Sequence, residues 1–225
     1  MMNKSTLASY IDHTLLKPEA SRSAIVTLCE EAKTHEFKTV CVHPYWVETA
    51  VALLEGSQVG VTTVIGFPHG MNVPEVKAYE TEIAIKQGVA DVDMVINMGA
   101  LKSGDDDHVL RDIQAVVNAA ANKATVKVII ETSQLTDTEK VKASELCVQA
   151  GADFVKTSTG FHTGGATLSD VRLMKETVGD HAKIKASGGV KNAAVAEEYI
   201  EAGTDRIGTS SGIAIVSGAE SGSDY

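Results

Sequence analysis

The sequence predicts an α/β protein that folds as a single-domain (β/α)8 TIM barrel, and three observations lead to this fold class. Short runs rich in Val and Ile alternate with longer amphipathic stretches along the 225-residue chain. Such alternation is typical of parallel strands joined by crossover helices. Seven runs are clear, an eighth candidate lies near the N-terminus, and the length suits a barrel of about 200 to 250 residues. A doubly wound open sheet is the alternative that this pattern leaves open.

The predicted strands are bounded by Gly, Pro, Ser, Thr or Asn, as buried strands usually are. They are the candidate Tyr10–Leu16, followed by Thr39–His43, Val59–Phe67, Asp91–Asn97, Val126–Thr132, Asp153–Thr159, Ile184–Gly189 and Asp205–Gly212. Helices are predicted over Pro74–Gln87, Thr136–Gln149, Leu168–Val178 and Asn192–Ala202. A glycine follows each helix within two residues, which favours termination there, and Thr136 with Glu139 has the pattern of a capping box.

The composition excludes several classes of protein. With 20 Lys and Arg against 30 Asp and Glu, the net charge is −10, which disfavours binding to nucleic acid. No apolar run reaches the roughly 18 residues of a membrane span, and the N-terminus lacks the apolar segment of a signal peptide. The three cysteines form no CxxC pair, which suits a reducing compartment. We therefore expect a cytoplasmic protein that binds no membrane, with a barrel over residues 1–216 and a flexible tail over 217–225.

Three predicted strands contain ionisable residues where a buried parallel strand should be almost wholly apolar. These are Asp93, Lys156 and Lys185. Either lysine alone is as well explained by a head group that reaches solvent at the rim, as we expect for Lys183 at the start of its strand. We expect Asp91 to bond to backbone at a strand start. Two lysines on consecutive strands, each followed by Thr or Ser and then Gly, favour a functional role.

The reactivity of a lysine towards a carbonyl depends on its protonation state. An amine attacks a carbonyl only when it is neutral, whereas an exposed lysine has a pKa near 10.4. Burial and a second nearby cation both lower that pKa, and adjacent strands lie only about 4.8 Å apart. We therefore expect Lys156 and Lys185 to lie close together, with one activated as a nucleophile and Asp93 supplying a carboxylate for proton transfer.

A second group of residues follows the last two strands. Gly188-Gly189-Val190-Lys191 comes after one of them, and Gly208-Thr-Ser-Ser-Gly212 comes after the other and precedes Ile213. In barrels, the loops after the last two strands and a short helix that follows often bind phosphate. Backbone amides approach a phosphate closely where glycine leaves room. The pattern indicates a phosphate site.

These residues belong to motifs that resemble a known family along nearly the whole chain. The motifs are Ile11-Asp-His-Thr-Leu-Leu-Lys17, Val40-Cys-Val42, Thr63-Val-Ile-Gly-Phe-Pro68, Glu75-Val-Lys-Ala-Tyr-Glu80, Val92-Asp-Met-Val-Ile-Asn97, Lys127-Val-Ile-Ile-Glu131, Asp153-Phe-Val-Lys-Thr-Ser-Thr-Gly160 and Lys185-Ala-Ser-Gly-Gly189. The chain resembles the deoxyribose-phosphate aldolases, which are class I (Schiff-base) aldolases. The resemblance implies a carbon–carbon lyase that reversibly cleaves 2-deoxy-D-ribose 5-phosphate to D-glyceraldehyde 3-phosphate and acetaldehyde, in deoxyribose phosphate catabolism.

The resemblance also implies roles for individual residues. Lys156 matches the Schiff-base lysine, and Asp93 and Lys185 match the pair that donates and accepts protons. The positions that match the family's substrate-binding residues are Asp12, Thr14, Cys41, Gly160, Gly188, Gly189, Val190, Ser210, Ser211 and the terminal Tyr225. No metal or other cofactor is expected, because an iminium ion takes the part of the Lewis acid, and the histidines show no HxH or HExxH spacing.

One departure and two alternatives accompany this reading. Some family members place a Lys directly after Thr-Ser-Thr-Gly, whereas Phe161 and His162 follow here, which leaves Lys191 and backbone amides to face the phosphate. A barrel lyase or isomerase that uses the two lysines as acid and base would form no covalent intermediate. A phosphosugar-binding barrel in which Lys156 merely pairs with Asp93 would bind without turnover. We also expect a homodimer or homotetramer, since such barrels commonly pair through their outer helices.

Overall fold

The computed structural model describes residues 2–218 and shows the predicted barrel. Eight parallel strands follow one another in chain order around a closed sheet, and β1 pairs with both β2 and β8. The strands are β1 (Ile11–Leu15), β2 (Thr39–Val42), β3 (Gly60–Ile65), β4 (Asp91–Val95), β5 (Thr125–Ile129), β6 (Phe154–Lys156), β7 (Lys183–Ser187) and β8 (Arg206–Thr209). The closed order rules out the open doubly wound sheet.

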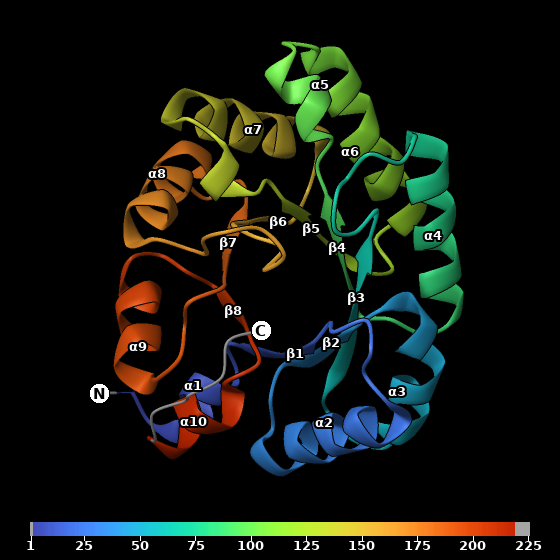
Figure 1. Cartoon of the computed structure of the whole chain (residues 1–225), viewed down its shortest axis with the longest axis vertical. Helices are drawn as coiled ribbons and strands as arrows, with labels where there is room; N and C mark the ends of the chain where they lie inside the picture. Colours follow the sequence, from blue (N-terminus) through green and yellow to red (C-terminus); the bar gives the residue numbers. More distant parts are fainter. Residues whose placement is uncertain (1, 219–225) are drawn as a thin grey trace.

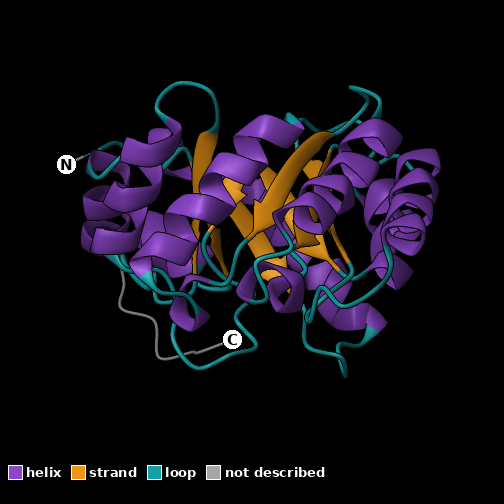
Figure 2. Ribbon diagram, turned by 90° about the horizontal axis from the view of Figure 1, so that it is seen from above, coloured by secondary structure: helices purple, strands orange, loops and turns teal. Residues whose placement is uncertain are grey.

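Helices surround the strands on the outside of the barrel (Figures 1 and 2). They are α1 (Lys4–Ala8), α2 (Arg22–His35), α3 (Val47–Leu53), α4 (Pro74–Lys86), α5 (Met98–Lys102), α6 (Asp106–Ala120), α7 (Asp137–Ala150), α8 (Leu168–Val178), α9 (Ala193–Glu201) and α10 (Gly212–Ser217), with 3-10 turns η1 (Pro44–Trp46) and η2 (Thr132–Gln134). Within residues 2–218, none of the helices has the length and apolarity that a membrane crossing requires.

Local sequence signals explain where the helices begin and end. The Thr136 hydroxyl and the Glu139 carboxylate form the predicted capping box at the start of α7, and Gly151 ends that helix in the left-handed region at φ 82°. Pro74 opens α4 at its first turn, where a missing N–H costs nothing. The four predicted helices are confirmed, each with its ends within one residue.

The main hydrophobic core lies between the strands and the surrounding helices. It includes the outward-facing strand residues Val40, Val92, Val128 and Ile184, all fully buried. A much smaller apolar group of Leu16, Cys41 and Val64 forms a separate cluster. The inside of this barrel is therefore not filled by apolar layers alone, and charged side chains occupy much of it.

The predicted tail begins at a position that the structure assigns to a helix. Ser217 is the last residue of α10, and Gly218 follows it in a left-handed conformation. Tyr225 lies outside the described residues. The division into a barrel over 1–216 and a tail over 217–225 therefore stays a prediction.

Candidate active site

Seven charged side chains from six strands meet inside the barrel, and we call them the charge cluster. They are Asp12, Asp91, Asp93, Lys127, Lys156, Lys185 and Arg206. Each is buried, and the most exposed of them, Arg206, has 8% of its surface accessible. Unpaired charges at such depth would be very costly, so the contacts among these groups decide their protonation states.

Asp93 lies where the two predicted lysines meet. Lys156 and Lys185 lie on the adjacent strands β6 and β7, where they are register partners. Both amines contact the same oxygen of Asp93, with Nζ to Oδ2 distances of 2.7 Å for Lys156 and 2.8 Å for Lys185. The predicted proximity of these three residues is therefore confirmed.

The two lysines differ in their other contacts. Lys185 Nζ also donates to Asp12 Oδ2 at 2.5 Å, so it lies between two carboxylates. Burial opposes its charge, but Asp12 and Asp93 outweigh burial and raise the pKa of Lys185 well above its ordinary value. Burial lowers the pKa of Lys156. The carboxylate of Asp93 raises this pKa, but the positive charge of Lys185 lowers it further, so the net shift is downward. Of the two, Lys156 is therefore the amine that loses its proton first.

Both carboxylates beside the lysines remain ionised. Burial alone would raise their pKa values, but the surrounding cations outweigh it. Lys127, Lys156 and Lys185 hold the pKa of Asp93 well below its usual range. Lys185, Lys127 and Arg206 do the same for the pKa of Asp12.

Lys127, Asp91 and Arg206 belong to the cluster although the sequence did not assign them to the site. Lys127 Nζ lies 3.0 Å from Asp93 Oδ1 and 2.6 Å from Asp91 Oδ2. Arg206 Nη1 donates to Asp91 Oδ2 at 3.1 Å and to Asp12 Oδ1 at 2.8 Å. Asp91 thus joins the interior ion pairs, and the expectation that it bonds to backbone is wrong.

A shift of one residue explains the different behaviour of Asp91. Asp153 and Asp205 come two residues after the glycine that ends the preceding helix, and each accepts a backbone N–H from a neighbouring strand at 2.8 Å and 3.0 Å, respectively. Asp91 comes three residues after Gly88 and is already a strand residue paired with Thr62. Because side chains alternate along a strand, this extra residue turns the Asp91 carboxylate into the barrel.

The other predicted pocket residues differ in their surroundings. Thr14 and Cys41 are register partners on β1 and β2, and both are buried. Burial raises the pKa of the Cys41 thiol to about 11, which keeps it protonated at neutral pH. Lys183 is the exposed first residue of β7, as expected for a lysine that starts its strand in solvent.

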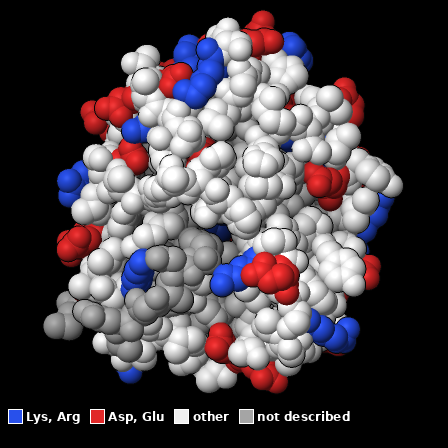
Figure 3. All heavy atoms as spheres, in the orientation of Figure 1, with Lys and Arg blue, Asp and Glu red and all other residues white. Residues whose placement is uncertain are grey.

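The predicted phosphate residues gather around one cavity of about 380 Å³. Its lining includes all six of them, which are Gly160, Gly188, Gly189, Val190, Ser210 and Ser211. Gly188 and Gly189 have φ of 82° and 85°, a region that residues with a Cβ rarely adopt. Lys191 and His162 also line this cavity and are its ionisable residues. Viewed along the barrel, the surface has a hollow near its centre, with Lys or Arg atoms visible in it (Figure 3).

Glu131 holds the segment that leads from Lys156 to this cavity. It adopts a left-handed conformation with φ 58°, which is unusual for a residue with a side chain. Its Oε2 accepts hydrogen bonds from the Thr159 hydroxyl at 2.5 Å and from the Thr159 N–H at 3.1 Å. This role was not predicted from the sequence, although Glu131 directly follows the apolar residues Val128, Ile129 and Ile130.

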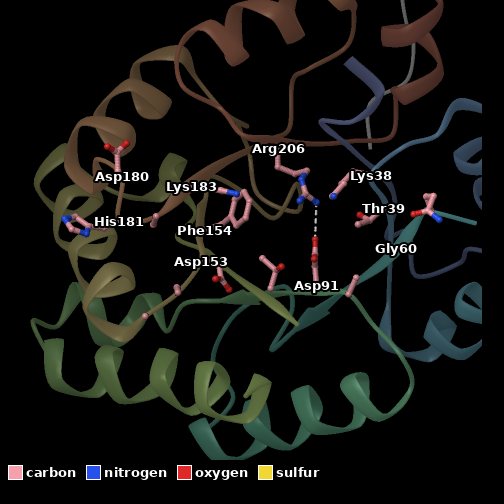
Figure 4. A pocket seen from close by; sticks show the side chains of 16 residues that line it. Lys38, Thr39, Gly60, Asp91, Asp153, Phe154, Asp180, His181, Lys183 and Arg206 are labelled. Atoms are coloured by element: carbon pink, nitrogen blue, oxygen red, sulfur yellow. Dashed lines mark hydrogen bonds and ion pairs between the residues drawn. The ribbon is translucent and has the colours of Figure 1, made fainter. Parts of the chain in front are cut away.

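A larger cavity of about 720 Å³ lies at the opposite, amino-terminal ends of the strands. Figure 4 shows its lining, with Lys38, Phe154 and Lys183 near the Arg206–Asp91 ion pair. Lys156 and Asp93 are absent from the linings of both cavities, but Gly160, four residues after Lys156, lines the smaller one. Active sites of such barrels lie at the carboxyl ends of the strands, so the smaller cavity is the better candidate for the substrate.

Comparisons with known proteins agree with this geometry. Residues 6–218 match the model of a family described as DeoC/LacD family aldolase. The chain is 60% identical over 222 residues to a deoxyribose-phosphate aldolase of Geobacillus sp. (strain WCH70), covering 99% of this chain and 100% of the relative. It is 62% identical over 209 residues to that of Enterococcus faecalis, covering 93% and 95%. A tetrameric deoxyribose phosphate aldolase from Aeropyrum pernix superimposes with a TM-score of 0.89 at 32% identity, covering 96% of this chain and 91% of that one.

Proposed function

Because the chain belongs to the DeoC/LacD family of aldolases, we propose that it reversibly cleaves 2-deoxy-D-ribose 5-phosphate to D-glyceraldehyde 3-phosphate and acetaldehyde. The enzyme would act in deoxyribose phosphate catabolism through a Schiff base on Lys156. One observation carries the assignment of the nucleophile. The Lys156 amine is buried with its pKa lowered, 2.7 Å from a carboxylate, on a strand whose next residues lead to the glycine-lined cavity.

In the first step, neutral Lys156 attacks the C1 aldehyde of the open-chain sugar. The carbinolamine that results loses water and becomes a cationic imine. The Asp93 carboxylate lies beside this nitrogen and stabilises its positive charge, just as it contacts the free amine at 2.7 Å. The positive nitrogen then serves as an electron sink.

The C2–C3 bond breaks when the C3 hydroxyl loses its proton. A water held by Asp93 accepts that proton, and the two electrons of the C2–C3 bond move to C2 and the imine to form an enamine. D-glyceraldehyde 3-phosphate is released at this point. Lys185, hydrogen-bonded to Asp93 at 2.8 Å, passes protons to and from this carboxylate.

The enamine is then protonated at C2, and water hydrolyses the new imine to free acetaldehyde and Lys156. Tyr225, which the resemblance assigns to the substrate-binding residues, lies outside the described part of the chain. We assign the phosphate to the 380 Å³ cavity, because glycines and Lys191 line it and glycine lets backbone amides approach a phosphate closely.

A cleavage assay tests this function against its two alternatives. Wild-type protein should form both aldehydes from 2-deoxy-D-ribose 5-phosphate, and Lys156→Ala should form neither. Lys183→Ala, an exposed lysine of the neighbouring strand, is the matched control and should retain the activity. Binding of the sugar without products would favour a phosphosugar-binding barrel. Cleavage that persists in Lys156→Ala would favour acid–base chemistry without a covalent intermediate.

We further propose that the protein is a homodimer or homotetramer that associates through α4. The apolar side chains of Val76, Tyr79 and Ile83 recur on one face of this helix and are exposed. The tetrameric relative from Aeropyrum pernix supports association in this fold. Tyr79→Glu should reduce the mass measured by light scattering, whereas Glu82→Gln on the same helix should not. An unchanged mass in Tyr79→Glu would exclude α4 from the interface.

A cytoplasmic location is also proposed. Cys29, Cys41 and Cys147 are buried free thiols. Unpaired cysteines persist in reducing compartments, where disulfides are rare. Fractionation of the source cells, with an activity assay of each fraction, tests this location.

A further inference from the structure

Six members of the charge cluster form a closed ring of alternating charges. In order around it, the ring is Asp12, Lys185, Asp93, Lys127, Asp91 and Arg206, and Arg206 returns to Asp12. Each carboxylate of the ring contacts two ring cations, and each cation contacts two ring carboxylates. The ring is therefore electrically balanced without Lys156.

Lys156 is the seventh member of the charge cluster and lies outside the ring. Its single ion-pair partner among the described residues is Asp93, which already contacts Lys127 and Lys185. A charged Lys156 would give the buried cluster four cations against three carboxylates. Because an uncompensated charge is costly in a medium of low dielectric constant, the balance favours the neutral form of Lys156.

The remaining groups that face Lys156 do not alter this balance. Cys41 on β2 carries no charge at neutral pH, since burial raises its pKa to about 11. Glu131, beyond the end of β5, bonds to Thr159 and has no ion pair with the cluster in the described part of the chain. The strand β3 adds no charged side chain: Val64 is the register partner of Asp93, and Thr62 Oγ1 lies 2.8 Å from Thr39 Oγ1 on β2.

We propose that Lys127 and Arg206 are positioning residues that keep Lys156 in its neutral, nucleophilic form by balancing the carboxylates of the ring. This inference rests on the proposed function for the use of that amine, but the protonation state itself belongs to the folded protein alone. Neither residue touches the substrate in this account. Arg206 acts from the far side of the barrel, where its ion pair with Asp91 borders the 720 Å³ cavity (Figure 4).

The proposal predicts shifts of opposite sign for opposite changes of the ring. Arg206→Met removes a cation and leaves the carboxylates in excess, so the pKa of Lys156 should rise. Asp91→Asn removes a carboxylate and leaves cations in excess, so the pKa of Lys156 should fall. The double variant Arg206→Met/Asp91→Asn restores the balance of charges and should return the pKa of Lys156 toward its wild-type value. Each single shift should be on the order of one pKa unit, which changes the neutral fraction about tenfold.

The test is a titration of Lys156 by NMR in protein labelled with 13C at lysine Cε, with the signal assigned by its loss in Lys156→Met. Arg206→Lys keeps the charge and should keep the wild-type value. Lys183→Met is the matched control, because Lys183 lies 5.7 Å from the Phe154 ring much as Arg206 lies 5.6 Å from it, yet makes no ion pair with the cluster. If Arg206→Met does not fold, Asp91→Asn and the double variant still give the two opposing comparisons.

The outcomes separate this proposal from the proposed function. Equal pKa values of Lys156 in wild type, Asp91→Asn and the double variant would overturn the inference, as would an ordinary lysine value in wild type. If the shifts occur but the protein cleaves no sugar, the ring controls the amine and the proposed reaction is wrong. If the protein cleaves the sugar and the shifts are absent, the reaction stands and the ring does not set the state of Lys156.

Discussion

At the scale of single residues, Asp93 acts on Lys156 in two opposed ways. Its carboxylate stabilises the cationic imine, yet the same charge favours the unreactive ammonium form of the free amine. Burial and Lys185 counter that effect, so the pKa of Lys156 stays below its ordinary value. The reactive state therefore depends on a difference between large electrostatic contributions, and small changes near Asp93 should be visible in the kinetics.

The substitution Asp93→Asn separates these two effects. Loss of the proton carrier should lower the maximal kcat/KM by about 10² to 10⁴. Loss of the negative charge should lower the pKa of Lys156, so the acidic limb of the pH–rate profile should move to lower pH. The measurement is kcat/KM against pH for both proteins. An acidic limb at higher pH in Asp93→Asn would contradict the assigned electrostatics.

Gly208 on β8 is required by close approach and not by backbone conformation. A Cβ at this position would lie 2.5 Å from Ser187 Oγ and 3.0 Å from Lys185 Cε. Gly208→Ala should therefore displace the Lys185 amine from Asp93 and lower kcat by at least an order of magnitude while the protein remains folded. In the control Gly99→Ala, the new methyl group meets only the flexible end of Met71 and Asn97 Oδ1, at 3.3 Å or more. Wild-type kcat in Gly208→Ala would contradict the assigned position of Lys185.

Sequence reasoning at this scale found the residues whose motif is unusual and missed those whose partners are distant in the chain. Lys156 and Lys185 were predicted because each interrupts an apolar strand before Thr or Ser and Gly. Lys127 interrupts its strand in the same way, but its role depends on register with Asp93, which only the sheet reveals. For Asp91, the alternation of side chains along the strand was the missed signal.

At the scale of elements, a buried ion pair ties α4 to α6 and to the end of β4. Lys77 Nζ donates to Asp112 Oδ2 at 2.5 Å and to the Val95 carbonyl at 2.9 Å, and both charged side chains are fully buried. Burial lowers the pKa of Lys77 and raises that of Asp112, so burial disfavours the charged form of each group.

Breaking this pair from one side should be worse than removing it. Lys77→Met leaves Asp112 without its cation and should reduce the free energy of unfolding by about 3 to 5 kcal/mol. The double variant Lys77→Met/Asp112→Leu should recover most of that loss. Urea unfolding of the three proteins measures the difference. A double variant less stable than Lys77→Met would show that the pair itself, and not the stranded carboxylate, sets the stability.

The segment from Lys156 to the phosphate cavity depends on Glu131. Glu131→Ala removes both acceptor contacts to Thr159 and should loosen Gly160, so KM for the phosphorylated sugar should rise several-fold with little change in kcat. Gln134→Ala is the control, since this half-buried side chain bonds only to its neighbour Ser133 among the described residues. Equal KM values in Glu131→Ala and wild type would show that the segment holds its shape without Glu131.

The predicted elements match the structure better in their type than in their ends. All eight strands were predicted, but six of the runs extend two or three residues past the observed strand end, as Asp153–Thr159 does beyond Lys156. The reason is that residues after each strand remain buried at the carboxyl face, such as Thr157 and Ser158 here. These residues are still buried although they no longer form strand hydrogen bonds. Because a sequence pattern indicates burial and not hydrogen bonding, the predicted strands extend too far.

At the scale of the whole molecule, the buried carboxylates link stability to pH. Cations hold the pKa values of Asp12 and Asp93 below those of an unfolded chain. Such groups contribute stability above the unfolded pKa of about 3.9, and that contribution is lost as the pH falls through and below it. Urea unfolding at a series of pH values should therefore show a decrease below about pH 5. A constant free energy of unfolding down to about pH 3 would contradict this account.

Schiff-base catalysis at Lys156 is tested most directly by reduction with borohydride in the presence of acetaldehyde, followed by peptide mass mapping. We expect an ethyl adduct on Lys156 that is absent in Lys156→Ala, because Lys156 is the cluster amine outside the balanced ring. An adduct on Lys185 would reverse the roles of the two lysines. Folded protein with no adduct on either lysine would contradict Schiff-base catalysis altogether.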